Sequence, residues 1–159
     1  MVGAQRRVGG DRGGPQKSSR RRSRELALQA LYQLELSGTA PQHGVPLLAE
    51  HFEADTADLP FARDLAEGAV AHMPEIDAAI AESSEHWSLT RMARVDLAIL
   101  RLATYELLHR PDVPTSVVLN EAIELGKRYG TEESGPFVNG VLDRVAKLAG
   151  QRRAGRATP

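Results

Sequence analysis

Residues 95–108 (VDLAILRLATYELL) are apolar at ten of fourteen positions. Their three charges, Asp96, Arg101 and Glu106, are spaced five residues apart, so successive charges lie about 140° apart around a helix. They form no polar stripe, and a helix that is apolar nearly all round belongs in a protein interior. Length and the dominance of Leu and Ala argue against a strand. This stretch therefore predicts a buried central helix, with Arg101 and Glu106 pairing with neighbouring helices.

Apolar residues recur at helical spacing along most of the remaining chain, and Gly and Pro separate the segments. Pro74 falls inside one segment and should kink or split it near Met73. No segment shows sustained strand alternation. The pattern predicts an all-α helical bundle of about seven helices, with expected ranges 20–37, 45–52, 60–84, 88–92, 95–110, 114–129 and 134–148.

Length and composition narrow the class of protein. A chain of 159 residues forms one domain with a proper core. The absence of Cys excludes disulfides and thiol nucleophiles and suits a reducing compartment. The sequence contains no run of eighteen apolar residues, so it predicts no membrane span. The N-terminus carries no secretory signal. These features predict a cytoplasmic location.

The net charge of −1 conceals an asymmetry. Residues 1–24 carry eight Arg or Lys and one acid, and residues 150–159 carry three Arg and no acid, whereas residues 25–149 carry nine basic and twenty acidic residues. Residues 1–18 are predicted to be a disordered basic extension and residues 149–159 a flexible basic tail. Such arms favour an anionic partner, and a solvated tail is the alternative.

The first predicted helix begins with Arg20, Arg21, Arg22 and Arg24. Cations are unfavourable at the positive end of a helix dipole. A cluster placed there is easier to understand if an anionic group binds it, although solvent can also screen the penalty.

The search for catalytic and metal motifs gives a negative result. The chain has no GxGxxG or Walker loop and no GxSxG nucleophile motif. No histidine falls in HExxH, and none shows a metal-ligand spacing supported by carboxylates. We therefore expect no enzyme activity, no cofactor and no metal site among the five histidines, His43, His51, His72, His86 and His109.

The segment FVNGVLD carries three informative residues. Gly140 costs about 1 kcal/mol inside a helix relative to Ala, which predicts close helix packing there. Asn139 is expected to bind a buried backbone group, with a role facing a ligand as the alternative. Phe137 is a candidate platform for stacking an RNA base, with ordinary core packing as the alternative.

Two segments together resemble the NusB family of bacterial transcription factors: RRRSRELALQALYQLELS, and RVDLAILRLATYELLHRPDVPTSVVLNEAIELGKRYGTEESGPFVNGVLDRVAK. The resemblance spans residues 19–148 and is loose over residues 39–86. It implies an all-helical, non-catalytic protein built as two small bundles. It also implies pairing with NusE, a ribosomal protein of the small subunit, and binding of boxA-type single-stranded RNA. Such a pair supports antitermination by RNA polymerase on ribosomal RNA operons, and some family members form homodimers.

The resemblance also suggests site residues. The family's RNA-binding positions fall on Arg20, Arg21, Arg22, Arg24, Tyr32, Glu133 and Phe137, and its NusE-facing acid falls on Asp96. The family commonly has Asp at position 133 and Glu at position 96. Glu133 and Asp96 therefore keep the negative charge but differ from the family in side-chain length. Glu133 would repel phosphate, and we expect it to accept a hydrogen bond from a base edge or to position an Arg.

Three alternatives stay open at this stage. The chain could be the NusB-like N-terminal domain of an rRNA cytosine methyltransferase, although it shows no Gly-rich cofactor loop. A helical DNA-binding protein would also explain the basic arm. A non-catalytic helical interaction module would bind a protein partner without RNA.

Overall fold

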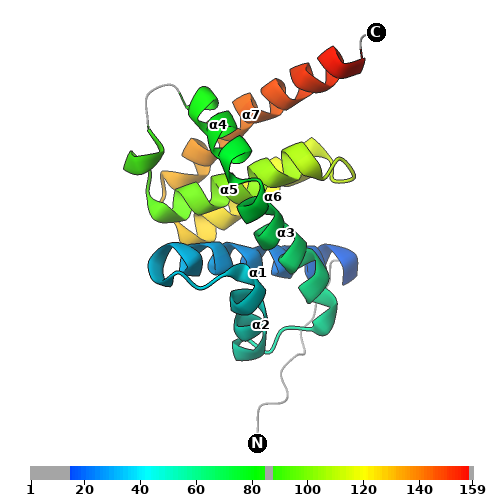
Figure 1. Cartoon of the computed structure of the whole chain (residues 1–159), viewed down its shortest axis with the longest axis vertical. Coiled ribbons are helices and arrows are strands. Elements are labelled where there is room, and N and C mark those ends of the chain that lie inside the picture. Colours follow the sequence, from blue (N-terminus) through cyan, green and yellow to red (C-terminus); the bar gives the residue numbers. More distant parts are fainter. Residues whose placement is uncertain (1–14, 85–87, 158–159) are drawn as a thin grey trace, which may run out of the picture.

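The computed structural model describes residues 15–84 and 88–157, and every regular element in these ranges is a helix (Figure 1). Its elements are α1 (Pro15–Ser37), α2 (Pro41–His51), the 3-10 turn η2 (Thr56–Asp58), α3 (Leu59–Ala71), α4 (Met73–Ser83), the 3-10 turn η3 (Leu89–Arg91), α5 (Arg94–His109), α6 (Thr115–Tyr129) and α7 (Ser134–Ala157). The predicted all-α class is confirmed. Most of the expected N-terminal extension, and His86, lie outside the described residues. None of the described helices combines the length and apolar character that crossing a membrane requires.

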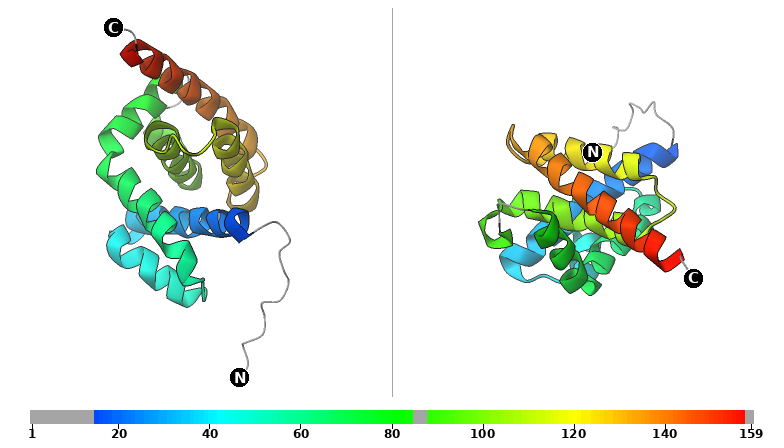
Figure 2. Two further views of the ribbon diagram at one scale, coloured as in Figure 1. Left: turned by 90° about the vertical axis from the view of Figure 1, so that its right-hand side faces the viewer. Right: turned by 90° about the horizontal axis from the view of Figure 1, so that it is seen from above.

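Helix α5 is the central helix of the fold, as its sequence predicts. Ten of its sixteen residues are buried, and it contacts α1, α3, α4, α6 and α7. Helices α1, α2 and α3 pack on one another as one small bundle, and α4 to α7 form the second (Figures 1 and 2). Because α5 packs against both α1 and α3, it joins the two bundles into one core.

Pro and Gly set several helix boundaries. The segment that contains Pro74 is split, because α3 ends at Ala71 and α4 begins at Met73. Pro74 lies in the first turn of α4, where a missing N–H costs no hydrogen bond. Gly38, with φ +77°, ends α1 in the left-handed conformation that Gly adopts without strain.

Gly68 on α3 leaves space for a side chain of α5. A Cβ atom at this position would lie 2.3 Å from Cζ of Tyr105 on α5, so only Gly allows the tyrosine ring to rest on α3. The prediction that Gly140 permits close packing is wrong, because a Cβ atom there would meet no atom within 4 Å. The predicted burial of Asn139 is also wrong, since its side chain is exposed.

Two helices begin earlier than the sequence predicts. Helix α1 starts at Pro15 and α2 starts at Pro41, so residues 15–18 belong to a helix and not to a disordered extension. Proline favours the first helical turn because its φ angle is fixed near the helical value. Helix α2 also continues through Pro46, which stands within its span.

The C-terminal helix extends further than expected. Helix α7 continues to Ala157, where the sequence predicts a flexible tail from residue 149. Ala149 is buried, and Arg153 donates a hydrogen bond to the carbonyl oxygen of Leu107 on α5. These contacts along the second bundle explain why this segment is helical.

Candidate nucleic-acid and partner interface

The arginines of α1 do not form one cluster. Arg20 and Arg24 are one helical turn apart and both lie over the ring of Phe61, with guanidinium carbons 4.3 and 5.4 Å from its centre. Arg24 is only 3% exposed and donates two hydrogen bonds, of 2.9 and 2.8 Å, to the Glu106 carboxylate on α5. Its guanidinium is therefore not available to phosphate, and the prediction that Arg24 binds RNA is wrong. Glu106 pairs with a neighbouring helix, as expected.

Arg21 pairs with α6 instead, and Arg22 pairs with Glu25 of its own helix. Arg21 donates hydrogen bonds of 3.1 and 2.8 Å to Glu121. Arg22 lies 3.2 Å from Glu25, whose other carboxylate oxygen accepts a 2.8 Å hydrogen bond from Arg128. The hydrogen bond with Glu121, and then its charge, raise the pKa of Arg21. Both side chains remain partly exposed, at 49% and 39%, so phosphate can approach them.

The starting position of α1 changes the electrostatic argument. Because the helix begins at Pro15, the four arginines lie in its second and third turns. The helix dipole acts mainly within the first turn, so it does not disfavour these cations strongly. Acidic partners contributed by other elements and by Glu25 compensate the charges, as the ion pair of Arg20 with Asp112 at 3.8 Å also shows.

Helix α6 extends the positive charge of α1. Lys127 and Arg128 have side chains 66% and 61% exposed. Together with Arg21 and Arg22 they form what we call the α1/α6 basic surface. Their sequence pattern indicates only a helix end. Their place on this surface depends on ion pairs in which a glutamate on each of α1 and α6 binds an arginine of the other helix.

Two shallow grooves continue from this surface across α6 to the start of α7. The first is lined by Arg21, Val117, Asn120, Glu121, Ile123, Glu124 and Lys127. The second is lined by Ile123, Lys127, Gly130, Thr131, Glu132, Gly135, Pro136 and Asn139. Because Ile123 and Lys127 line both grooves, the surface is continuous, and Asn139 belongs to its wall rather than to the core.

Glu133 and Phe137 lie at the α7 end of this surface. Glu133 is exposed, its backbone N–H donates a 3.2 Å hydrogen bond to the Thr131 hydroxyl, and its carbonyl oxygen accepts one from the backbone N–H of Phe137. Phe137 is half-buried and packs against the core, so only part of its ring is open to a base. Neither residue lines the second groove, but their chain neighbours Glu132 and Pro136 do.

Tyr32 lies away from the arginines. It is eleven residues beyond Arg21, which is roughly 16 Å along a helix. Its half-buried ring belongs to a mainly apolar groove, which we call the α1/α5 groove, lined by Leu28, Gln29, Tyr32, Gln33, Leu36, Ser37, Leu48, Val95 and Tyr129. Tyr32 is thus near the start of α5 and not on the α1/α6 basic surface.

Asp96 stands next to Val95 in the first turn of α5. It is half-buried, and its Oδ1 atom is buried without a hydrogen-bond partner among the described residues. An unsatisfied buried acceptor costs about 1–3 kcal/mol, and a donor supplied by a bound protein would remove that cost. Asp96 and the α1/α5 groove together form a candidate partner surface.

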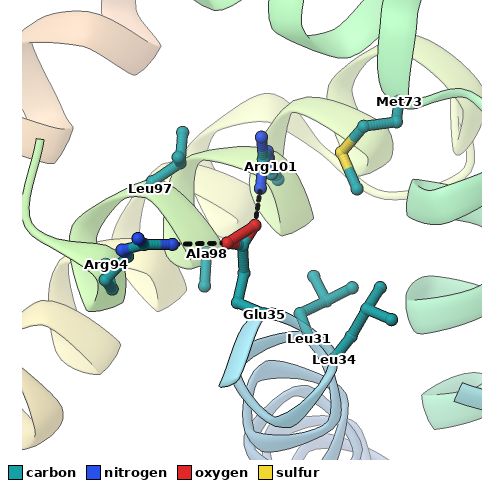
Figure 3. A pocket seen from close by; sticks show the side chains of 8 residues that line it. All are labelled: Leu31, Leu34, Glu35, Met73, Arg94, Leu97, Ala98 and Arg101. Atoms are coloured by element: carbon teal, nitrogen blue, oxygen red, sulfur yellow. Dashed lines mark hydrogen bonds and ion pairs between the residues drawn. The ribbon is translucent and has the colours of Figure 1, made fainter. Parts of the chain in front are cut away.

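A smaller pocket between α1 and α5 is occupied by ion pairs. Glu35 lies between Arg94 and Arg101, at 2.6 and 3.4 Å (Figure 3). Arg101 also donates hydrogen bonds of 2.9 and 3.0 Å to Asp77 on α4. Burial opposes the charge of Arg101, but these carboxylates outweigh it and raise its pKa. The expected pairing of Arg101 with neighbouring helices is confirmed, and this network links α1, α4 and α5.

Residues 21–147 match the model of the NusB family. The chain belongs to the NusB family. It is 48% identical over 136 residues to the transcription antitermination protein NusB of Desulfitobacterium hafniense strain DSM 10664 / DCB-2, covering 84% of this chain and 92% of that relative. The NusB protein of Myxococcus xanthus is also 48% identical, over 132 residues, with coverage of 80% and 94%. Because the alignments cover 92% and 94% of these relatives, the relatives contain no additional methyltransferase domain.

Solved NusB structures share the fold. T. maritima NusB superposes with a TM-score of 0.73 at 45% identity, covering 80% of this chain and 90% of that one. A chain from a structure of antitermination factors NusB and NusE in complex with dsRNA gives a TM-score of 0.76 at 30% identity, with coverage of 82% and 98%. The relatives are named for antitermination of transcription and not for a catalysed reaction.

Proposed function

We propose that this protein is a cytoplasmic, RNA-binding transcription antitermination factor that pairs with NusE and binds boxA-type single-stranded RNA of ribosomal RNA operons. The observation that carries the proposal is the α1/α6 basic surface, which leads into the start of α7 in a chain of the NusB family. A related structure contains NusB, NusE and RNA, which supports both partners.

The chemistry of the basic surface suits a nucleic-acid backbone. Arg21, Arg22, Lys127 and Arg128 supply cations for phosphates, while Phe137 and the polar groove wall at Asn139 offer contacts to bases. Each arginine already has a carboxylate partner, so phosphate binding must share or displace it. Sequence-specific RNA recognition usually targets unpaired bases, which favours a single strand over the double strand named for the related complex.

The proposed binding surface for NusE consists of Asp96 and the α1/α5 groove. Asp96 and the α1/α5 groove offer an unsatisfied acceptor beside apolar area, which is the combination that a protein partner can cover. The RNA and protein surfaces lie along α1 at different distances from its start, so one molecule can bind both. Contact with RNA polymerase would then be indirect, and a homodimer that covers either surface would compete with it.

Binding of labelled RNA, measured by fluorescence anisotropy, tests the proposal. A boxA-like single strand, a scrambled strand and a duplex are compared with and without NusE. We expect the boxA-like strand to bind most tightly and NusE to increase its affinity. If three or four phosphates are neutralised, raising the salt from 50 to 200 mM should weaken binding roughly 20- to 50-fold. A flat salt dependence, or equal affinity for the scrambled strand, contradicts the proposal.

A pair of lysine variants locates the surface. Lys127 and Lys147 are both exposed and each pairs with an acid on its own helix, at 3.7 and 3.2 Å. Lys127→Ala should reduce the slope of log affinity against log salt by about 0.7, which is one phosphate contact with a single strand. Lys147→Ala is the matched control and should leave the slope unchanged, and equal effects would place the RNA elsewhere.

A further inference from the structure

Three side chains with metal-binding atoms converge where α3, α4 and α5 meet. His72 stands between α3 and α4, Glu75 lies in the first turn of α4, and His109 is the last residue of α5. Glu75 Oε1 is 2.8 Å from His109 Nε2 and 3.8 Å from His72 Nδ1. Each of the three residues offers one possible ligand atom within 4.8 Å of those of the other two. No other group of this kind occurs in residues 15–84 and 88–157.

These distances are close to those of a coordinated ion. Zn²⁺ binds imidazole nitrogen and carboxylate oxygen at about 2.0–2.2 Å, so two ligands of a tetrahedral ion are about 3.3–3.5 Å apart. The two observed separations from Glu75 fall on either side of this value. The side chains of His72 and Glu75 are 44% and 43% exposed, so small rotations can bring the ligands together without repacking the core.

The ring of Tyr105 lies beside the two imidazoles. The rings of His72 and His109 are stacked with centres 4.0 Å apart, and the Tyr105 ring lies 6.1 and 5.4 Å from them. Tyr105 is itself fixed, because its ring rests on Gly68 and its hydroxyl donates a 3.1 Å hydrogen bond to Asp64.

We propose that His72, Glu75 and His109 form a binding site for a divalent transition-metal ion such as Zn²⁺. Two imidazoles and one carboxylate suit Zn²⁺, Co²⁺ or Ni²⁺ better than Mg²⁺ or Ca²⁺, which prefer oxygen ligands. A bound ion would tie the end of α5 to the α3–α4 junction and keep one coordination position for water or a partner side chain. The sequence did not suggest this site because His109 is 34 residues from Glu75.

The site is independent of the proposed RNA-binding function. None of its ligands lines the α1/α5 groove or belongs to the α1/α6 basic surface. The competing explanation is that Glu75 accepts a hydrogen bond from an imidazole and binds no ion. Metal titration separates the two explanations, because only a coordination site gives the visible absorption of tetrahedral Co²⁺.

The test is a titration of the metal-free full chain with Co²⁺, followed by displacement with Zn²⁺. We expect one ion per chain, visible Co²⁺ bands that Zn²⁺ removes, and a higher Tm in Zn²⁺. His109→Ala and Glu75→Gln should each weaken Co²⁺ binding at least roughly 10- to 100-fold, the range found even for residues that only support a metal ligand. The double variant His43→Ala/His51→Ala, which removes two exposed histidines of α2, is the control and should bind as the wild type does.

Three results would overturn the proposal. They are the absence of the Co²⁺ bands in the wild type, unchanged affinity in Glu75→Gln, and an equal loss of affinity in the α2 control. Glu75→Gln changes an exposed side chain and retains its shape, so its effect does not depend on a folding defect. If His109→Ala lowers the Tm in the absence of metal, the comparison of Glu75→Gln with the wild type still decides the outcome.

Discussion

Removing one partner of the Arg24–Glu106 pair should destabilise the protein severely. Both residues are almost completely buried, at 3% and 2% exposed, and two hydrogen bonds of 2.9 and 2.8 Å join them. In Arg24→Ala the Glu106 carboxylate would be left buried without its cation. Breaking a buried pair in this way costs about 3–5 kcal/mol. The variant also loses the contact of the guanidinium with the Phe61 ring.

Urea denaturation followed by circular dichroism measures this cost. A loss of about 4 kcal/mol, with a slope of about 2 kcal/mol/M, moves the midpoint down by roughly 2 M. Domains of this size have a total stability of about 5–15 kcal/mol, so the variant should be marginal but still show a cooperative transition. Arg24→Met/Glu106→Leu removes both charges and should recover most of the loss, because replacing a buried ion pair by apolar side chains is often neutral.

An exposed pair on α3 provides the comparison. Arg63 and Glu67 lie 3.2 Å apart with side chains 51% and 37% exposed, and such pairs contribute about 0.3–0.5 kcal/mol. Arg63→Ala should therefore hardly move the midpoint. If Arg24→Ala behaves like Arg63→Ala, or if it keeps full stability while weakening RNA binding, the structural role of Arg24 is refuted.

Three further predictions concern acid stability and the two surfaces. The hydrogen bond from Arg110 lowers the pKa of Asp112 from 3.8 to about 2. The contribution of the ionised Asp112 to stability is therefore present above about pH 4 and is lost as the pH falls toward 2. The urea midpoints of the wild type and Asp112→Asn should differ at pH 5 and converge toward pH 2. Phe137→Ala should weaken binding of the boxA-like strand by about 1–3 kcal/mol while the helical melting transition persists, and loss of that transition would make Phe137 a core residue only. Asp96→Arg should abolish NusE pairing in a pull-down but spare weak RNA binding by the protein alone, whereas loss of both would indicate misfolding.

The fold was largely predictable because apolar spacing and helix-breaking residues act locally. The central helix is predicted at 95–110 and observed at Arg94–His109. The break between α3 and α4 lies just before Pro74, because proline has no N–H to continue the hydrogen bonds of the preceding helix. Helix ends were less predictable, because they depend on tertiary contacts. The hydrogen bond from Arg153 to Leu107 supports a helical C-terminal segment that its Gly-rich, basic composition does not suggest.

The candidate site was predicted less well, since exposure depends on packing between distant segments. Lys127 and Arg128 belong to the basic surface through ion pairs and grooves shared with α1, which no local pattern reveals. Gly140 was interpreted as a residue that allows close packing, whereas a Cβ atom would be excluded at Gly68, because Tyr105, far away in the sequence, rests on it.

The division of the α1 arginines follows from helix geometry. With about 100° per residue, Arg24 lies only about 40° from Arg20 around the helix, on the side that Ala27 and Leu31 continue into the core. Arg21 and Arg22 lie about 100° and 200° from Arg20, away from that side. Because Arg24 fixes the rotation of α1 against Glu106, it also sets the direction in which Arg21 and Arg22 point. A run of four arginines thus contains a structural anchor as well as its exposed cations, and only the exposed ones can account for salt-dependent RNA binding.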